Sequence, residues 1–290
     1  MSSPERSSIG QAVRWACILE VCAPKAGNVH PGASFADTTW RDFVHSANAI
    51  APILNEAAAR GVGQTILDSV KATKEAVGKN TNLGIILLLA PLCAVDRATP
   101  LREGIGPVLR NLTVRDAELT YEAIRLAKPG GLGDAQSQNV AEPPTQTLLE
   151  VMQLAAGRDD IARQYTCDFC DVFTTLPAFL SQHSPSISSQ KIVLAHLAQL
   201  CVRPDTLIVR KCGLELAQAI QHRAHSLFTA PDFLLDGPAF QAFDAYLRAD
   251  GNRRNPGTTA DLVVAALFVC LREGKIAPPF PWVDRILETL

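Results

Sequence analysis

Hydrophobic residues recur along most of this chain at intervals of three or four, which is the spacing of a helix that buries one side. Near the N-terminus, for example, Ile9, Val13 and Ala16 share one face of a predicted helix. The same periodicity predicts helices at residues 8–21, 43–60, 62–77, 83–95, 117–127, 145–156, 160–180, 189–201, 207–228, 239–247, 259–273 and 281–290. No run of alternating β-branched residues is long enough to indicate a sheet. The pattern therefore predicts an all-α fold.

Polar residues indicate where several of these helices begin. Thr39 with Asp42, and Thr113 with Asp116, have the spacing of capping boxes. The segment 83–95 is apolar on every side and is predicted to be a buried central helix. No repeat or low-complexity linker separates the helices, so we expect a single large domain across all 290 residues. Its ligand cleft is expected between the helices, in the connecting loops.

Composition and charge narrow the class of protein. The 27 basic and 29 acidic residues give a net charge of −2, which argues against general nucleic-acid binding. The first ten residues lack an apolar signal core, and residues 83–95 are short for a membrane span. Eight irregularly spaced cysteines, including Cys167 and Cys170, are typical of reduced core thiols. We therefore expect a cytoplasmic protein without a membrane partner; its amphipathic helices would suit a homodimer without demanding one.

Three polar loops beside predicted helices are candidates for chemistry. The first holds Glu20, Lys25, Asn28, His30 and Asp37 in a stretch constrained by proline and glycine. Lysine and histidine in such a turn can contact an anion, while a carboxylate can bind magnesium or accept a proton. An ordinary connector with solvated charges is the alternative interpretation.

The second loop, Asn80, Thr81 and Asn82, leads directly into the apolar segment that begins at Leu83. Free backbone N–H groups at a helix start can hold a phosphate, and the helix dipole favours the negative charge. Capping alone would also explain these side chains.

The third loop combines arginine, glycine and paired threonines at the start of the helix predicted over residues 259–273. Such donors suit a polyphosphate, and a carboxylate there could orient a ligand or bind a metal ion. Thr258 and Asp261 could instead form a capping box. The candidate residues of this loop are Arg254, Asn255, Gly257, Thr258, Thr259 and Asp261.

A fourth, glycine-rich stretch contains Lys128, Gly130, Gly131 and Asp134. It follows a predicted helix, whereas a dinucleotide fingerprint or a Walker loop follows a strand. The stretch is therefore interpreted either as a connector that ends a helix or as a flap over a ligand.

The polar loops resemble, in order, motifs of the triphosphoribosyl-dephospho-CoA synthase family. The stretch EVCAPKAG, which begins at Glu20, resembles the family's Glu-Val and Pro-Lys-Pro-Gly residues. Gly32 and Ala33 with Asp37 resemble its Gly-Ala-His-x-Asp segment.

Two further motifs extend the resemblance towards the C-terminus. Residues 80–84, NTNLG, resemble the family's Asn-Thr-His-Lys-Gly, and residues 256–268, PGTTADLVVAALF, resemble its Pro-Gly-Gly-Ser-Ala-Asp-Leu-Leu-Ala. The resemblance covers the chain from about residue 10 to about residue 275.

The motifs also depart from the family pattern. Ala26 replaces the second proline, Ser34 replaces a histidine, and Asn82 and Leu83 replace His-Lys. The loss of a lysine would change the contacts to phosphate. The middle segment, residues 128–144, looks more like a subgroup associated with pterin-linked one-carbon metabolism.

The resemblance implies an all-helical transferase that uses ATP with Mg²⁺. The 2′-hydroxyl of 3′-dephospho-CoA, or of a related acceptor, attacks C1 of the ATP ribose, and adenine leaves. On this basis Asp37 is expected to act as the base or as a magnesium ligand. Glu20 and Asp261 are expected as supporting carboxylates, with Asp261 also a candidate metal ligand. Contacts to the nucleotide and its phosphates are expected from Lys25, Asn28, His30, Asn80, Thr81, Asn82, Arg254, Asn255, Gly257, Thr258 and Thr259.

Two other functions are compatible with the same loops. One is an ATP-dependent transferase or kinase-like enzyme in the biosynthesis of a pterin- or furan-type one-carbon carrier. The other is a nucleotide-binding protein without catalysis, suggested by the replaced His-Lys pair.

Overall fold

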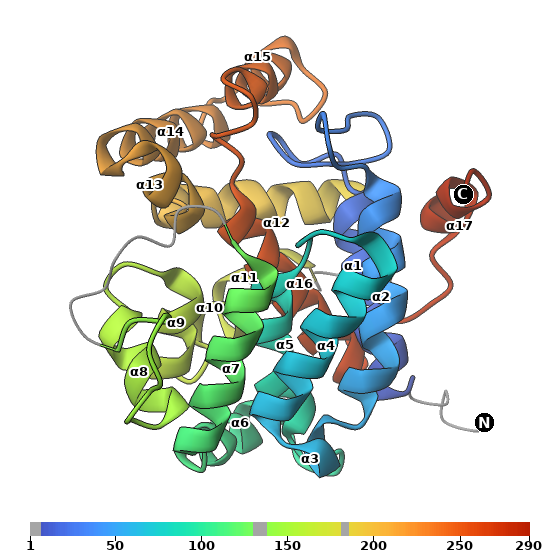
Figure 1. Cartoon of the computed structure of the whole chain (residues 1–290). Helices are drawn as coiled ribbons and strands as arrows, with labels where there is room; N and C mark the ends of the chain where they lie inside the picture. Colours follow the sequence, from blue (N-terminus) through green and yellow to red (C-terminus); the bar gives the residue numbers. More distant parts are fainter. Residues whose placement is uncertain (1–6, 130–137, 181–185) are drawn as a thin grey trace.

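The chain folds into α-helices, as the periodicity predicts (Figure 1). The computed structural model describes residues 7–129, 138–180 and 186–290. Within these ranges it contains no strand, and extended pairing is limited to one bridge between His30 and Ala33. The helices are α1 (Ile9–Cys22), α2 (Trp40–Asn55), α3 (Ala57–Arg60), α4 (Val62–Val77), α5 (Leu83–Ala94), α6 (Leu101–Arg110), α7 (Val114–Ala127), α8 (Leu148–Ala155), α9 (Asp160–Thr166), α10 (Cys170–Phe173), α11 (Thr175–Leu180), α12 (Ser189–Val202), α13 (Thr206–Cys212), α14 (Leu214–Phe228), α15 (Pro238–Arg248), α16 (Gly257–Arg272) and α17 (Pro281–Leu287).

Helix α16 runs through the middle of the molecule, with other helices around it (Figure 1). From Thr258 to Arg272 every residue except Asp261 is buried, because the segment carries apolar side chains on all sides. Helix α5 has no polar side chain and packs against α16. The predicted buried central helix is thus confirmed, and it is one of a pair.

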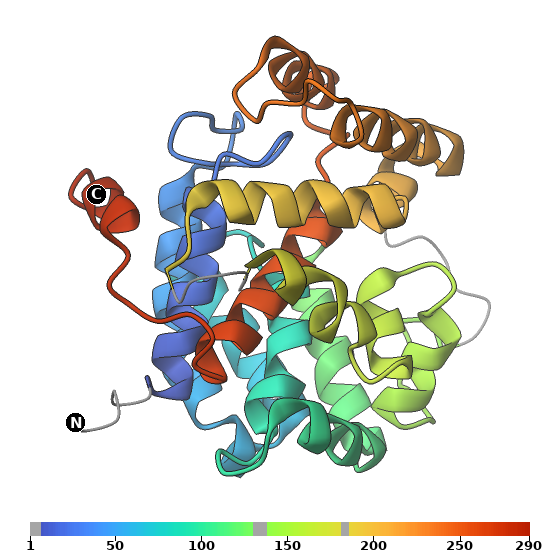
Figure 2. The same ribbon diagram turned by 180° about the vertical axis from the view of Figure 1, so that it is seen from behind.

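The remaining helices cover this pair. On one side α1, α2, α4 and α7 pack against one another in that order. On the other side α12 packs against α14 and α16 (Figure 2). The N-terminal ends of α5 and α16 therefore reach the loops that follow α1 and α12.

The predicted capping boxes are confirmed. The backbone N–H of Thr39 donates to Asp42 Oδ2 over 2.7 Å, and that of Thr113 donates to Asp116 Oδ2 over 2.8 Å. Side chains close in sequence thus define where α2 and α7 begin.

Two segments that were predicted as single continuous helices are each broken into shorter helices, so the prediction is wrong there. The segment 160–180 is broken after α9, where Asp168 and Phe169 adopt left-handed φ values of 49° and 60° and Phe169 is fully buried. The segment 207–228 is broken at Gly213, whose φ of 89° suits glycine. Periodicity survives such breaks, because the apolar residues on both sides still face the same core.

Other helix boundaries also differ from the prediction. The segment 43–60 is divided between α2 and α3, and α6 (Leu101–Arg110), where no helix was predicted, is present. No single helix of the described ranges is long and apolar enough to cross a membrane, although the bent pair α12 and α13 passes that test of length and composition jointly.

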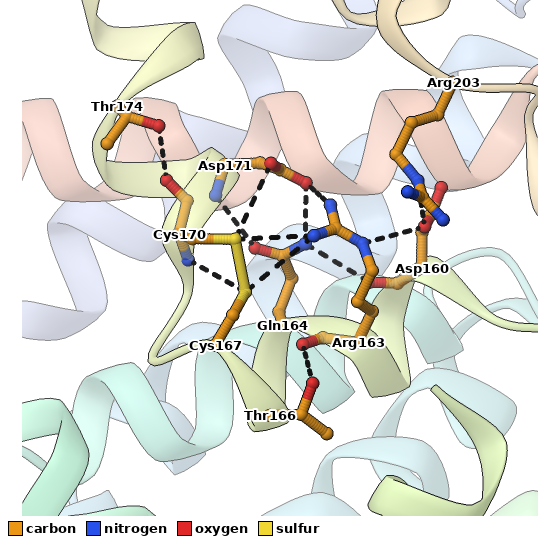
Figure 3. Close-up of a disulfide and its surroundings, with 9 residues drawn as sticks. All are labelled: Asp160, Arg163, Gln164, Thr166, Cys167, Cys170, Asp171, Thr174 and Arg203. Atoms are coloured by element: carbon orange, nitrogen blue, oxygen red, sulfur yellow. Dashed lines mark hydrogen bonds and ion pairs between the residues drawn. A yellow bond between two sulfur atoms is a disulfide. The ribbon is translucent and has the colours of Figure 1, made fainter. Parts of the chain in front are cut away.

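Cys167 and Cys170 form a disulfide between α9 and α10 (Figure 3). The expectation of a reduced thiol is therefore wrong for this pair, whereas the other six cysteines are free. The guanidinium of Arg163 lies beside both sulfur atoms and pairs with Asp171 and Asp160. The disulfide thus sits in a polar cluster next to α9.

Candidate active site

A cavity of about 720 Å³ lies where the polar loops meet. This volume is within the range of about 300–1,000 Å³ that is usual for ligand pockets. The first loop contributes Glu20 and Asn28, and the second contributes residues 80–84. The third loop contributes Asn255, Gly257, Thr258 and Asp261. The structure thus brings together three loops that are far apart in sequence.

Glu20 and Lys25 form a buried ion pair at the wall of this cavity. The Lys25 ammonium lies 2.9 Å from Glu20 Oε1 and donates to the backbone oxygens of Glu20 and Ala23. These three contacts use its three N–H groups, and Lys25 is fully buried, so it is not placed to bind a phosphate. Burial raises the pKa of the Glu20 carboxyl, and the charge of Lys25 opposes this increase.

Asp261 is a second carboxylate in the cavity wall, in the first turns of α16. Desolvation raises its pKa well above the ordinary value, the negative charge of Glu20 raises it further, and Arg210 opposes the increase. The carboxylate also packs against the backbone of α5, because a Cβ atom at Gly84 would collide with Asp261 Oδ2. Glycine at position 84 is therefore required for α5 to approach Asp261.

Asparagine side chains supply neutral polar groups to the cavity. Asn28 Nδ2 donates to Asn255 Oδ1 over 2.9 Å. Asn28 Oδ1 and Asn82 Nδ2 are buried without a hydrogen-bond partner in the part of the chain that the structure describes. An unpaired buried polar atom costs free energy, so both atoms are natural contacts for a ligand.

The Asn80 side chain, in contrast, is already occupied. Its Oδ1 accepts from the backbone N–H groups of Asn82 and Leu83, as a cap for the start of α5. The Thr81 hydroxyl lies 2.6 Å from that of Ser46. Of the second loop, Asn82 is thus the residue with a buried polar atom that lacks a partner within the described residues.

A carboxylate that sequence reasoning missed, Asp205, organises the start of α16. Its Oδ2 accepts from both the backbone N–H and the hydroxyl of Thr259, and its Oδ1 accepts from Leu207 and Ile208 at the start of α13. Thr259 is therefore committed to a structural contact, and the alternative capping box of Thr258 with Asp261 is not formed. Burial raises the pKa of Asp205, and these hydrogen bonds oppose the increase.

Three other predicted site residues do not line the cavity. The Asp37 side chain is exposed and accepts from the Thr38 hydroxyl. His30 accepts from the backbone of Gly32, and burial lowers its pKa to about 4, so it is uncharged at neutral pH. Arg254 stacks on the ring of Tyr246 at 4.5 Å.

The glycine-rich stretch is described only in part. Lys128 caps the end of α7 and borders a smaller pocket beside the cavity. Gly130, Gly131 and Asp134 lie outside the described residues.

The cavity also has basic residues that the sequence did not single out. These residues lie on helices and at helix ends where the sequence has no motif. Nothing in the sequence therefore distinguishes them from solvated surface residues. Arg210 pairs with Asp159 at 2.5 Å across the gap between α13 and α9. Arg125, Arg158, Arg210 and Lys211 make up this basic group.

Within residues 7–129, 138–180 and 186–290, no three His, Cys, Asp or Glu side chains gather closely enough to hold a metal ion. A magnesium ion that arrives with ATP needs fewer protein ligands, because Mg²⁺ keeps several waters and uses substrate phosphates. The cavity carboxylates Glu20 and Asp261 are oxygen donors of the type that Mg²⁺ prefers.

Comparisons with known proteins agree over most of the chain. The family model of the ATP:dephospho-CoA triphosphoribosyl transferases (CitG) matches residues 6–279. A crystal structure of a protein from Archaeoglobus fulgidus, assigned as a triphosphoribosyl-dephospho-CoA synthase, superposes with a TM-score of 0.65 at 27% sequence identity. The match covers 79% of this chain and 98% of that one. A search of the curated proteins found no match.

Proposed function

The chain belongs to the ATP:dephospho-CoA triphosphoribosyl transferase family and is a transferase of that kind, and we propose that its reaction takes place in the cavity between α1, α5 and α16. The observation that carries this proposal is the pair of carboxylates Glu20 and Asp261, which line one cavity and are held in different environments. Glu20 has Lys25 as a counter-ion, whereas Asp261 makes no ion pair of its own within the described residues.

The two environments suit the two proton transfers of the reaction. The acceptor hydroxyl forms a bond to C1 of the ATP ribose while the bond from C1 to adenine breaks, and its electron pair leaves with adenine. The hydroxyl must lose a proton, and adenine leaves more readily if it gains one. We assign the first task to ionised Glu20 and the second to protonated Asp261, since groups with separated pKa values can act as base and acid at one pH.

The negative charge of Glu20 has a second use. Breaking the bond to adenine gives C1 the character of an oxocarbenium ion, and a nearby carboxylate stabilises that positive charge. Asn28 and Asn82 would hold the substrates through their unpaired polar atoms. In this proposal, magnesium is the ion that is bound to ATP. We place the reaction in the cytoplasm, where ATP and dephospho-CoA are found.

The test compares Asp261→Asn with Asp37→Asn. Purified protein is incubated with ATP, magnesium and dephospho-CoA, and adenine is measured by chromatography. The proposal expects Asp261→Asn to lower adenine release by about 10²- to 10⁴-fold, the usual range for a lost general acid. The Asp37→Asn variant should keep its activity, because Asp37 is exposed and outside the cavity lining. Loss of activity only in Asp37→Asn would restore the expectation from the sequence and overturn this assignment.

A different acceptor is the second candidate. It is favoured by Asn82 and Leu83, which replace the family's His-Lys pair and lie buried at the cavity wall. A precursor of a pterin- or furan-type one-carbon carrier is the class that we propose for it. Adenine release that requires such a precursor, and not dephospho-CoA, would support this acceptor, and formation of ADP or AMP would indicate phosphoryl or nucleotidyl transfer.

A further inference from the structure

A second pocket, of about 310 Å³, adjoins the active-site cavity. It lies between the end of α4, the loop before α5 and the end of α7, and it shares Asn80 and Asn82 with the larger cavity. Lys74, Lys79 and Lys128 line it, and among the residues that the structure describes no carboxylate does. We call it the lysine pocket. Its lining is basic.

Two buried donors in the lysine pocket lack partners. Thr73 is 2% exposed and Asn82 is 4% exposed. The hydroxyl of Thr73 and the Nδ2 group of Asn82 make no hydrogen bond within the described residues. Leaving such groups unpaired costs free energy, whereas an anion in the pocket would satisfy both. The lining therefore combines positive charge with hydrogen-bond donors.

The three lysines are held in different ways. Lys79 is half-buried, and its ammonium donates to the Asp37 carbonyl and lies 3.3 Å from Asp42 Oδ2, which positions it at the pocket. Lys74 and Lys128 are exposed and stand at the C-terminal ends of α4 and α7. A lysine at one helix end is common because it complements the helix dipole. The helix dipole does not explain why two helix ends and Lys79 meet at the same lysine pocket.

The lysine pocket is close to the reacting groups. Asn82 precedes Gly84 by two residues, and Gly84 packs against Asp261. Gly84 therefore lies in the first turn of α5, which begins directly after Asn82, a residue that lines both cavities. The volume of the pocket, about 310 Å³, is at the lower end of the range of about 300–1,000 Å³ that is usual for ligand pockets.

We propose that the lysine pocket binds the triphosphate of ATP, so that the ribose C1 faces Glu20 and Asp261. This inference rests on the proposed function and replaces Lys25, Arg254 and Thr259 as triphosphate contacts. The triphosphate carries more negative charge than the diphosphate of dephospho-CoA, and the pocket with three lysines is therefore assigned to ATP. The basic group of Arg125, Arg158, Arg210 and Lys211, which lines the larger cavity, remains for the acceptor.

The test uses Lys74→Gln/Lys128→Gln, a change of two exposed residues that leaves the buried core untouched. Its matched control is Lys71→Gln, which removes a positive charge from the same helix outside the pocket, at an exposed pair with Glu122. The double variant should raise the KM for ATP by about a hundredfold, since a lost contact to a charged group typically costs about tenfold. The KM for dephospho-CoA should stay the same, and the control should match the wild type in both.

A binding measurement separates this inference from the proposed function. Inorganic tripolyphosphate is titrated into the wild type, the double variant and the control by calorimetry, without any turnover. Binding that the double variant loses and the control keeps would support the lysine pocket, even if no adenine were released by any of the three. An unchanged KM for ATP together with unchanged tripolyphosphate binding would overturn it, while dephospho-CoA-dependent adenine release would still support the proposed function. A raised KM for dephospho-CoA alone would also overturn it, because the pocket would then serve the acceptor.

Discussion

The carboxylate of Asp205 accepts hydrogen bonds from both the backbone N–H and the hydroxyl of Thr259, over 2.7 and 2.8 Å. Its other oxygen caps α13, so that one buried side chain joins the starts of two helices. Asp261 stands two residues after Thr259 on α16. The position of the proposed catalytic acid therefore depends on a contact between two residues that are 54 positions apart in the sequence.

Asp205→Ala should lower the free energy of unfolding by about 3 kcal/mol, because it removes two helix caps and leaves buried donors unpaired. Thr113→Ala, which removes a single cap at the surface, should cost about 1 kcal/mol. Urea denaturation of both variants measures the difference. Equal losses would show that the Asp205 contacts do not join the two helices energetically.

The rate of adenine release should fall at both low and high pH, which gives a pH profile with an acidic and an alkaline limb. At low pH the rate falls as Glu20 becomes protonated, and at high pH it falls as Asp261 loses its proton. Burial raises the pKa of both carboxyls, so both limbs should lie above the ordinary range of carboxylic acids. In Asp261→Asn the alkaline limb should disappear from the profile of kcat/KM, and its persistence would exclude Asp261 as the acid.

Gly84→Ala should reduce activity more than stability. The added Cβ would collide with Asp261 Oδ2 and lie 2.6 Å from Ile161, so the carboxylate must move. Overpacking of this kind costs about 1–3 kcal/mol, and a displaced proton donor would lower kcat further. Gly157→Ala is the matched control, since a Cβ there meets nothing within 4 Å. Wild-type kcat in Gly84→Ala would show that the contact is unimportant for catalysis.

Lys25→Met should destabilise the protein by about 3–5 kcal/mol at neutral pH, because it leaves Glu20 buried without a counter-ion. Without Lys25 the pKa of Glu20 rises further, and a group whose pKa is raised by folding loses stabilisation as pH increases. The loss should therefore shrink in acid, where Glu20 is protonated in both states. Denaturation at neutral and acidic pH measures this change.

The matched variant is Glu20→Gln/Lys25→Met, which removes both charges. It should recover most of the lost stability at neutral pH, since no unpaired buried charge remains. If the double variant is as unstable as Lys25→Met, Lys25 contributes through its bonds to the backbone oxygens of Glu20 and Ala23 and not through its charge.

The sequence by itself determined which segments are helical and where several of them begin. Capping by Thr39 with Asp42, and by Asn80, depends on side chains two or three residues from the groups they satisfy. Such local hydrogen bonds, like the periodicity of apolar residues, can be predicted without knowing the fold. The family motifs also indicated three loops that do line one cavity.

Only the tertiary structure decided what each side chain in those loops contacts. Lys25, a candidate phosphate ligand in the sequence, forms an ion pair with Glu20, and the Thr259 hydroxyl donates to Asp205. Lys74 looks like an ordinary surface lysine in the sequence, and Lys128 looks only like part of a connector or flap, until α4 and α7 place both at one pocket. The physical reason is that charge and hydrogen-bonding capacity belong to the residue, whereas burial and the choice of partner depend on which distant segments pack together.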